Sequence, residues 1–155
     1  MPASPPADGT EARLPKFLCF AIYSANLAFG RAYKPLLEPL GLTYTQYIAL
    51  VALSDADDQT VGELGEKLFL ESNTLTPILK KLEAAGYIRR QRDPADERQV
   101  RISLTPAGRR LIDMVPEATL LDATGLGDAF ATVQQATADL RDNLLRATQA
   151  KKTDG

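Results

Sequence analysis

The stretch from Ser72 to Leu104 constrains the fold of this chain more than any other segment. Its first part repeats apolar side chains at intervals of three and four residues, which predicts a helix with one buried face. Those side chains are Leu75, Ile78, Leu79 and Leu82. Two strand-like runs, 87–92 and 99–104, follow Gly86 and are joined by a polar, turn-forming segment. We therefore expect a winged helix-turn-helix, a mostly α fold with a small β-hairpin.

Capping residues locate the starts of three helices in the middle of the chain. Thr43 with Gln46, and Thr60 with Glu63, have the spacing of capping boxes, in which side chain and backbone bond reciprocally. Ser72 is expected to cap the third helix through its hydroxyl group. Three short helices before a hairpin are the arrangement that a winged helix-turn-helix requires.

The apolar pattern at both ends of the chain predicts a homodimer. Residues 17–30 contain no charged side chain, yet fourteen residues fall short of the roughly 20 that cross a bilayer. A helix that is apolar on most sides must be buried on most sides, which in a small chain requires a second subunit. Between Leu126 and Leu144, mostly apolar side chains recur at alternating steps of four and three residues. This spacing is typical of a seam, the stripe along which one helix packs against a partner helix.

These patterns predict the organisation of the whole chain. We expect a disordered arm at 1–12, a single domain at 13–150, and a frayed tail at 151–155. Within the domain, dimerisation helices are expected at about 14–40 and 106–148, the second with a break near Pro116 and a turn at Gly125 and Gly127. A DNA-binding core is expected at about 43–104.

Residue usage excludes several classes of protein. The chain has no histidine, which excludes Ser-His or Cys-His catalysis and His-ligated zinc or haem. One cysteine, Cys19, cannot form an internal disulfide. The N-terminus lacks the basic start and apolar run of a signal peptide. We expect a cytoplasmic protein that is not an enzyme and has no membrane contact, metal site or cofactor.

The charge of the chain is unevenly distributed. The net charge is −2, but residues 80–110 hold nine Lys/Arg and four Asp/Glu, a local charge of +5. The rest of the chain carries −7. A basic patch on an acidic body is typical of a protein that binds phosphates locally and avoids non-specific attraction elsewhere.

The helix that starts near residue 72 and the hairpin carry the residue types that read a DNA duplex. Short polar side chains allow a helix to enter the major groove, and flanking cations bind phosphates. An arginine at a hairpin tip is favoured in the narrow minor groove, and Arg98 is the best candidate, with Asp96 placed to orient it. The expected DNA-binding residues are Ser72, Asn73, Thr74, Thr76, Pro77, Lys80, Lys81, Arg90, Arg92, Asp96 and Arg98. The alternative is a solvated amphipathic helix beside a charged hairpin without a partner.

Cys19 has two interpretations. A lone free cysteine behaves most often as a small buried apolar residue. The functional alternative is a redox sensor whose thiolate is favoured by cations, a helix start or phenol donors. Tyr33, Tyr44 and Tyr47 would supply such phenols, although they are also ordinary core and interface residues. Fourteen helical residues separate Cys19 from Tyr33 by about 21 Å, so any contact between them must come from the other subunit.

Five segments of the chain together resemble one known family. They are 18–23 (LCFAIY), 33–37 (YKPLL), 42–47 (LTYTQY), 71–77 (ESNTLTP) and 96–98 (DER). These segments are similar to those of the organic-hydroperoxide-resistance repressors of the MarR family, over roughly residues 14–108. The cysteine segment is specific to this subgroup.

The resemblance implies a winged-helix dimer that represses a peroxide-detoxifying gene from a pseudo-palindromic DNA operator. Cys19 would be the sensor that organic hydroperoxides oxidise to a sulfenic acid. Tyr33 and Tyr44 match tyrosines that bond the sulfur across the dimer, and Tyr23 matches another in the same pocket. Asp96 and Arg98 match the carboxylate and the minor-groove arginine of the wing.

The chain departs from many members of that family in having no second, resolving cysteine. Residues 121–127 read LDATGLG, so the chain is similar to the one-cysteine type, whose sulfenic acid reacts with a small-molecule thiol or oxidises further. Two other functions remain open at this point. One is a MarR-type repressor that releases DNA when it binds a phenolic ligand non-covalently, and the other is a thiol peroxidase that uses Cys19.

Overall fold

The computed structural model describes residues 11–153, which form two compact units that divide between Val115 and Pro116. Most of the expected N-terminal arm lies outside the described residues, as do the last two residues of the expected tail. The expected single domain at 13–150 extends over both units.

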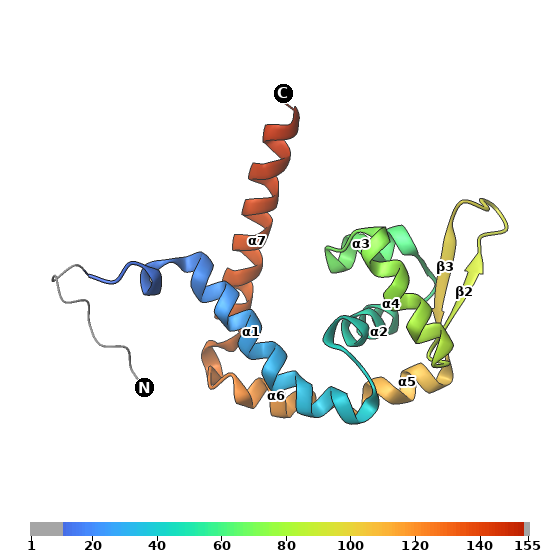
Figure 1. The fold of residues 1–155 in the computed structure, drawn as a ribbon, viewed down its shortest axis with the longest axis horizontal. Helices are drawn as coiled ribbons and strands as arrows, with labels where there is room; N and C mark the ends of the chain where they lie inside the picture. The colour runs from blue at the N-terminus through green and yellow to red at the C-terminus, as the bar shows by residue number, and fades with distance from the viewer. Residues whose placement is uncertain (1–10, 154–155) are drawn as a thin grey trace. The chain divides into compact units, whose positions relative to one another are not determined.

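The first unit contains most of the helices and all the strands of the described chain (Figure 1). Its elements are η1 (Leu14–Lys16), α1 (Leu18–Leu37), η2 (Glu38–Leu40), α2 (Tyr44–Asp55), β1 (Gln59–Thr60), α3 (Val61–Leu68), α4 (Ser72–Ala84), β2 (Ile88–Arg92), β3 (Val100–Leu104) and α5 (Pro106–Asp113). The second unit contains α6 (Glu117–Ala123), η3 (Gly127–Ala129) and α7 (Phe130–Thr153).

Both predicted capping boxes are confirmed. At the start of α2, the backbone N–H of Thr43 donates to Oε1 of Gln46 at 2.9 Å, and the backbone N–H of Gln46 donates to Oγ1 of Thr43 at 3.3 Å. Thr60 and Glu63 exchange the same pair of bonds, at 2.9 and 3.1 Å, at the start of α3. These reciprocal bonds satisfy backbone donors that a helix start otherwise leaves without partners.

The predicted cap at Ser72 is wrong by one residue. Glu71 has the extended backbone of an N-cap, and its carbonyl accepts the first helical bond, from the N–H of Leu75 at 3.0 Å. Ser72 is already helical, and its carbonyl accepts a hydrogen bond from Oγ1 of Thr76 at 2.7 Å. Helix α4 therefore begins without a side-chain cap on its backbone N–H groups.

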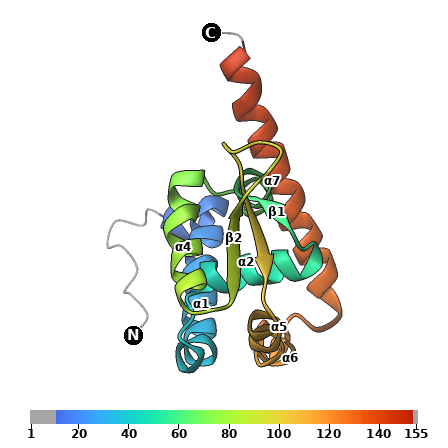
Figure 2. The ribbon, with the colours of Figure 1, turned by 90° about the vertical axis from the view of Figure 1, so that its right-hand side faces the viewer.

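The three strands form an antiparallel sheet in the order β1-β3-β2. The hairpin register pairs Arg90 with Ile102 and Arg92 with Val100, and β1 adds the pair Gln59 with Ile102 on the other edge. Helix α2 crosses the sheet and α4 lies along its β2 side (Figure 2). The sequence predicted the hairpin but not β1, because a strand of two residues has no detectable alternation.

The core of the first unit lies among the end of α1, α2, α3, α4 and the sheet. Its fully buried side chains are Leu37, Leu50, Leu53, Leu64, Leu75, Leu79, Leu82, Ile88 and Ile102. The stripe predicted on α4 thus faces this core, with Ile78 half-buried at its margin. Because the side chains on the outer face of α4 do not pack in the core, that face is available for another role.

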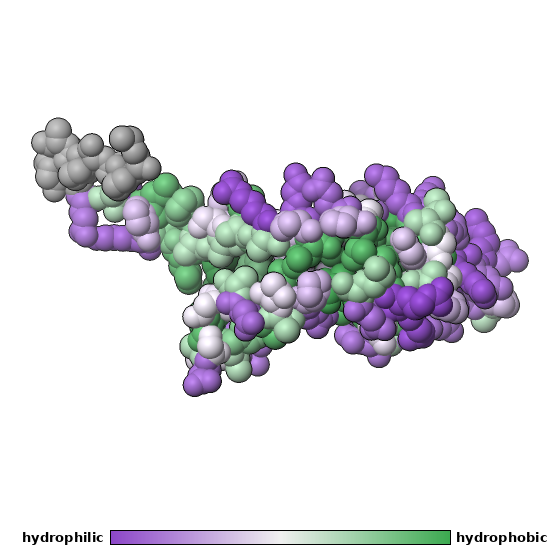
Figure 3. Space-filling view, turned by 90° about the horizontal axis from the view of Figure 1, so that it is seen from below, coloured by the Kyte–Doolittle hydropathy of each residue, from purple (hydrophilic) through white to green (hydrophobic). Residues whose placement is uncertain are grey.

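Helix α1 exposes a large apolar surface. Its exposed or partly exposed apolar side chains include Leu18, Ile22, Tyr23, Leu27 and Phe29, with fractional exposures of 61, 39, 60, 45 and 48%. In Figure 3, apolar side chains extend from the start of α1 to the middle of the view, whereas hydrophilic side chains cover the end that carries β2 and β3. An apolar face of this size on a folded protein marks an interaction surface.

No single helix among the described residues is long and apolar enough to span a membrane. The segments Leu18–Leu40 and Tyr44–Asp55, bent by 77° at the break between them, meet that length and composition only when taken together.

The C-terminal part of the chain contains the expected interruptions between its helices. The break at Pro116 is confirmed, since α5 ends at Asp113 and α6 begins at Glu117. Helix α7 begins at Phe130, so Leu126, the first position of the expected seam, precedes it. Gly125 and Gly127 both have positive φ, and this left-handed backbone forms the predicted turn before α7. At the other end, α7 continues through Lys151 into the expected frayed tail.

Candidate nucleic-acid interface and thiol site

The outer face of α4 is polar and exposed. Ser72, Asn73, Thr74, Pro77, Lys80 and Lys81 are exposed, and Thr76 is partly buried. The fold places these residues on one surface because their neighbours Leu75, Leu79 and Leu82 are held in the core. The surface combines short polar side chains with two lysines, and the N-terminus of α4 carries no side-chain cap that would compete with a bound anion.

The wing consists of β2, β3 and the segment 93–99 that joins them. Near its tip, Arg98 makes three hydrogen bonds to the carboxylate of Asp96: Nε to Oδ1 at 3.1 Å, Nη2 to Oδ2 at 3.3 Å, and the backbone N–H to Oδ1 at 3.1 Å. These bonds, first from the side chain and then from the backbone, lower the pKa of Asp96 below its usual value. The Arg98 side chain remains 89% exposed, so the pair holds the guanidinium group in position without burying it.

Arg90 and Arg92, which were also expected to bind DNA, are engaged within the protein. The carboxylate of Glu83 on α4 accepts the backbone N–H of Arg90 at 3.0 Å and its Nε at 3.3 Å, and the Arg90 side chain is only 23% exposed. Nη1 of Arg92 donates to the carbonyl of Glu97 at 2.8 Å, across the tip of the wing. Arg90 therefore links the wing to α4, and Arg92 shapes the tip.

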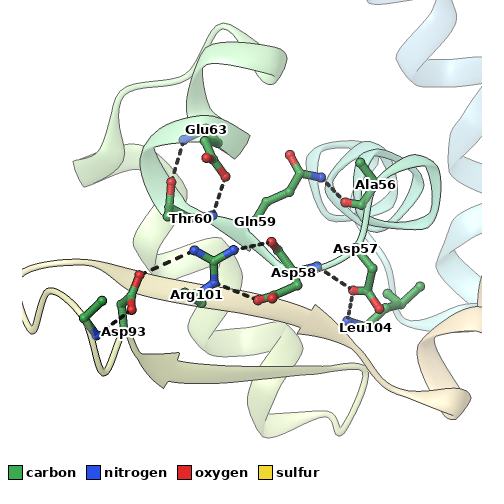
Figure 4. A network of polar contacts seen from close by, with 10 residues as sticks. Ala56, Asp57, Asp58, Gln59, Thr60, Glu63, Asp93, Arg101 and Leu104 are labelled. Atoms are coloured by element: carbon green, nitrogen blue, oxygen red, sulfur yellow. Dashed lines mark hydrogen bonds and ion pairs between the residues drawn. The ribbon is translucent and has the colours of Figure 1, made fainter.

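A second group of contacts, which the sequence did not predict, joins the wing to the loop between α2 and β1 (Figure 4). Arg101 on β3 donates to both the side chain and the backbone carbonyl of Asp58, and to the side chain of Asp93. Asp57 accepts the backbone N–H of Leu104 at 2.8 Å and Nη2 of Arg109 at 2.9 Å. The hydrogen bond and attraction of Asp58 raise the pKa of Arg101.

Cys19 lies in the first turn of α1 and is exposed. Tyr23, one turn further along, is 60% exposed. Because α1 is an uninterrupted helix from Leu18 to Leu37, Cys19 and Tyr33 are about 21 Å apart along it and do not meet within one chain. The interpretation of Cys19 as a buried apolar residue does not apply to the single chain.

Three tyrosines form a cluster where α1 meets α2. The ring of Tyr33 lies 4.9 Å from that of Tyr44 and 6.0 Å from that of Tyr47, measured between ring centroids. Tyr47 is buried and Tyr44 is 44% exposed, so the cluster extends from the core to the surface. The structure thus brings together three of the four tyrosines expected around the thiol, and leaves Tyr23 elsewhere on α1.

Two adjoining hollows open on this tyrosine cluster. Their volumes are about 400 and 360 Å³, and both are lined by Gly30, Tyr33 and Tyr44. The first also reaches Lys34 and the second reaches Leu27. Among residues 11–153, no group of three His, Cys, Asp or Glu side chains is arranged to hold a metal ion.

Comparison with known proteins identifies the family. The family described as transcriptional regulator SarA/Rot matches residues 31–115, which is more than half of the chain and spans α2 to α5. The chain belongs to this MarR-like family of transcriptional regulators. Its members regulate transcription and are not enzymes, which agrees with the expectation and leaves the alternative of a thiol peroxidase without support.

Individual relatives agree with this assignment. The chain is 48% identical over 131 residues to the HTH-type transcriptional regulator TtmR of Methylorubrum extorquens, covering 82% of the chain and 67% of TtmR. It is 47% identical over 96 residues to the organic hydroperoxide resistance transcriptional regulator of Bacillus subtilis, covering 62% of the chain and 65% of that protein. The chain therefore spans about two thirds of the length of either relative.

A solved structure shows the same fold. Reduced AbfR bound to DNA, from Staphylococcus epidermidis, matches with a TM-score of 0.72 and 35% identity, covering 86% of this chain and 96% of that one. The winged helix-turn-helix predicted from the sequence is confirmed.

Proposed function

We propose that this regulator is a homodimeric repressor that binds a pseudo-palindromic operator in the cytoplasm and releases it when an organic hydroperoxide oxidises Cys19. The observation that carries the proposal is the tyrosine cluster of Tyr33, Tyr44 and Tyr47, which opens on a hollow beside the uncovered apolar face of α1. The relative in Bacillus subtilis is a regulator of organic hydroperoxide resistance, which supports the class of oxidant.

The polar face of α4 and the wing tip supply the DNA contacts in this proposal. Asn73, Thr74 and Thr76 are short enough to let α4 approach base edges, and Lys80 and Lys81 reach toward phosphates. Arg98, exposed and oriented by Asp96, enters the minor groove. AbfR, at 35% identity over most of the chain, binds DNA in its reduced form, which supports the same arrangement here.

A second subunit completes the thiol site. A dimer that covers the apolar face of α1 brings Cys19 of one subunit to the tyrosine cluster of the other, since the two are too far apart within one chain. Phenol hydroxyl groups then donate to the thiolate and hold it in its reactive form. Two subunits also present two α4 helices, which match the two half-sites of a pseudo-palindrome.

Oxidation changes both the charge and the size of the group in this site. The thiolate sulfur attacks the hydroperoxide, an S–O bond forms as the O–O bond breaks, and the organic fragment leaves as an alcohol once protonated. With no second cysteine in the chain, a small-molecule thiol then condenses with the sulfenic acid to give a mixed disulfide and water. The new group disturbs the tyrosine hydrogen bonds and shifts the dimer helices, and a coupling of about 1–3 kcal/mol weakens operator binding about 5–150-fold.

The experiment is an operator-binding titration with and without cumene hydroperoxide, followed by dithiothreitol. The wild-type protein should lose affinity on oxidation and, in the presence of a small thiol, recover it on reduction. Cys19→Ser should bind the operator as wild type does and should not respond to the peroxide. Release of the Ser variant by peroxide would show that another group senses the oxidant.

The hollows beside the tyrosine cluster favour a second candidate. A phenolic ligand that stacks on Tyr33 or Tyr44 and meets Lys34 would fit a space of about 400 Å³ and could release DNA without chemistry at Cys19. Release by such a ligand would be insensitive to dithiothreitol and would persist in Cys19→Ser. The same titration therefore separates the two candidates.

A further inference from the structure

Arg101 lies at the centre of a chain of contacts that runs from the body of the first unit to the wing tip (Figure 4). Its Nε donates to Oδ1 of Asp58 at 2.9 Å, its Nη2 to the backbone carbonyl of Asp58 at 2.8 Å, and its Nη1 to Oδ2 of Asp93 at 3.4 Å. All three nitrogens of the guanidinium group are thus occupied by partners within the protein. The Arg101 side chain is 33% exposed, against 89% for Arg98.

Asp93 carries this connection into the turn at the wing tip. One carboxylate oxygen, Oδ1, accepts the backbone N–H of Ala95 at 2.9 Å, while the other, Oδ2, faces Arg101. The backbone N–H of Asp93 donates to the carbonyl of Gln99 at 2.9 Å and closes the turn at its base. The conformation of the segment that presents Arg98 therefore depends on where Asp93 is held.

Asp58 anchors the other end of the connection. It has a left-handed backbone, with φ of 55°, which Asp and Asn adopt more readily than most residues. This conformation aims both its carboxylate and its carbonyl group at one guanidinium. Asp58 precedes β1, which pairs with β3 at Arg101 and Ile102, and it lies outside the wing formed by β2, β3 and segment 93–99.

We propose that Asp58, Arg101 and Asp93 form a strut that holds the wing tip, and with it Arg98, in the orientation that enters the minor groove. Arg101 is then a positioning residue for operator binding, and it acts through the wing instead of contacting DNA. The inference rests on the proposed operator binding. A wing already held in its bound orientation loses less conformational entropy on binding than a mobile one, so the strut strengthens the complex.

The sign of the effect of Asp58→Asn on DNA affinity tests the proposal. The substitution keeps a residue type that tolerates the left-handed backbone but removes the charge that holds Arg101. If Arg101 contacted phosphates directly, removing a neighbouring negative charge would strengthen binding. If the strut positions the wing, Asp58→Asn should weaken operator binding about tenfold.

Asp55→Asn is the matched control. Asp55 is exposed at the end of α2, so its substitution removes the same charge from the same region without touching the strut. Affinities are measured by fluorescence anisotropy on one operator at one salt concentration. Asp55→Asn should bind as wild type does or slightly more tightly. Equal or tighter binding by Asp58→Asn would overturn the proposal.

A measurement on the DNA-free protein keeps the strut testable whatever the operator data show. In ¹⁵N relaxation experiments, Arg101→Gln should lower the backbone order parameters of Ala95 to Arg98 toward the flexible range, below about 0.6, while α2 and α4 keep values near about 0.85. A wing tip as ordered as in wild type would overturn the strut. If wild type prefers the operator no more than unrelated DNA, the proposed function fails, and these order parameters still decide the strut by themselves.

The double variant Asp58→Asn with Arg101→Gln distinguishes action through one strut from two separate effects. If both residues act through the same connection, the operator affinity of the double variant should be about equal to that of whichever single variant has the lower affinity. Additive losses would show that Arg101 contributes to binding independently of Asp58, which contradicts the proposal.

Discussion

The ring of Tyr33 on α1 lies 4.9 Å from the ring of Tyr44 on α2, with their planes inclined at 57°. The contact joins the helix whose apolar face is uncovered to the helix that crosses the sheet beneath the wing. A change at this pair therefore reaches both the expected dimer surface and the DNA-reading part of the first unit.

Tyr44→Phe should slow oxidation-triggered release without changing DNA affinity. The substitution keeps the ring that packs on Tyr33 but removes the hydroxyl group that would donate to the thiolate of Cys19 in the partner. A hydrogen bond to a charged group contributes about 1.5–3 kcal/mol, so the rate of DNA release under limiting cumene hydroperoxide should fall about tenfold or more. Stopped-flow anisotropy measures this rate. Tyr87→Phe, which alters a tyrosine outside the cluster, should react as wild type does.

The pair of Asp96 and Arg98 predicts a specific pH dependence. Because Arg98 lowers the pKa of Asp96, the ionised carboxylate contributes to the stability of the folded protein at any pH above its ordinary pKa. This contribution to stability is lost as the pH falls through the lowered pKa. Side-chain carbonyl NMR should find Asp96 titrating below the ordinary value of 3.8, and Arg98→Ala should return it toward that value. An Asp96 titration that is the same in both proteins would contradict the orienting role of the pair.

Glu83→Gln should lower stability and leave the preference for operator over unrelated DNA largely intact. The carboxylate bonds both the backbone and the side chain of Arg90, and a partly exposed pair of this kind contributes about 1 kcal/mol. Thermal unfolding followed by circular dichroism measures the loss, with Glu66→Gln, at an exposed position on α3, as the control. If Arg90 were instead a phosphate contact, Glu83→Gln would tighten DNA binding and leave the unfolding temperature unchanged.

Gly108→Ala should destabilise the first unit. A Cβ atom at this position in α5 would lie 2.3 Å from the backbone carbonyl oxygen of Tyr87, so the backbone itself must move. We expect a loss of about 1–3 kcal/mol in the free energy of unfolding, measured by urea denaturation. Gly62→Ala in α3 is the control, since its Cβ would meet nothing closer than 3.9 Å and alanine favours a helix. Equal stabilities of the two variants would contradict the close approach of α5 to the start of β2.

The local elements of the fold were predictable from the sequence because their determinants lie within a few residues of one another. The two capping boxes, the stripe on α4 and the break at Pro116 depend on spacings of three or four residues or on a single proline. The orienting contact of Asp96 with Arg98 spans two residues and was also expected. The cap at Ser72 was misplaced because a preferred residue type does not decide which carbonyl accepts the first helical bond.

The tertiary structure alone decided which distant residues meet. Arg101 and Asp58 are 43 positions apart, and the alternation in the hairpin does not indicate that a loop after α2 will meet β3 there. The tyrosine cluster forms because α1 and α2 pack together, and Glu83 diverts Arg90 from solvent because α4 lies beside β2. Capping and periodicity act within one turn of chain, whereas these contacts exist only after burial of the leucine core has brought separate elements together.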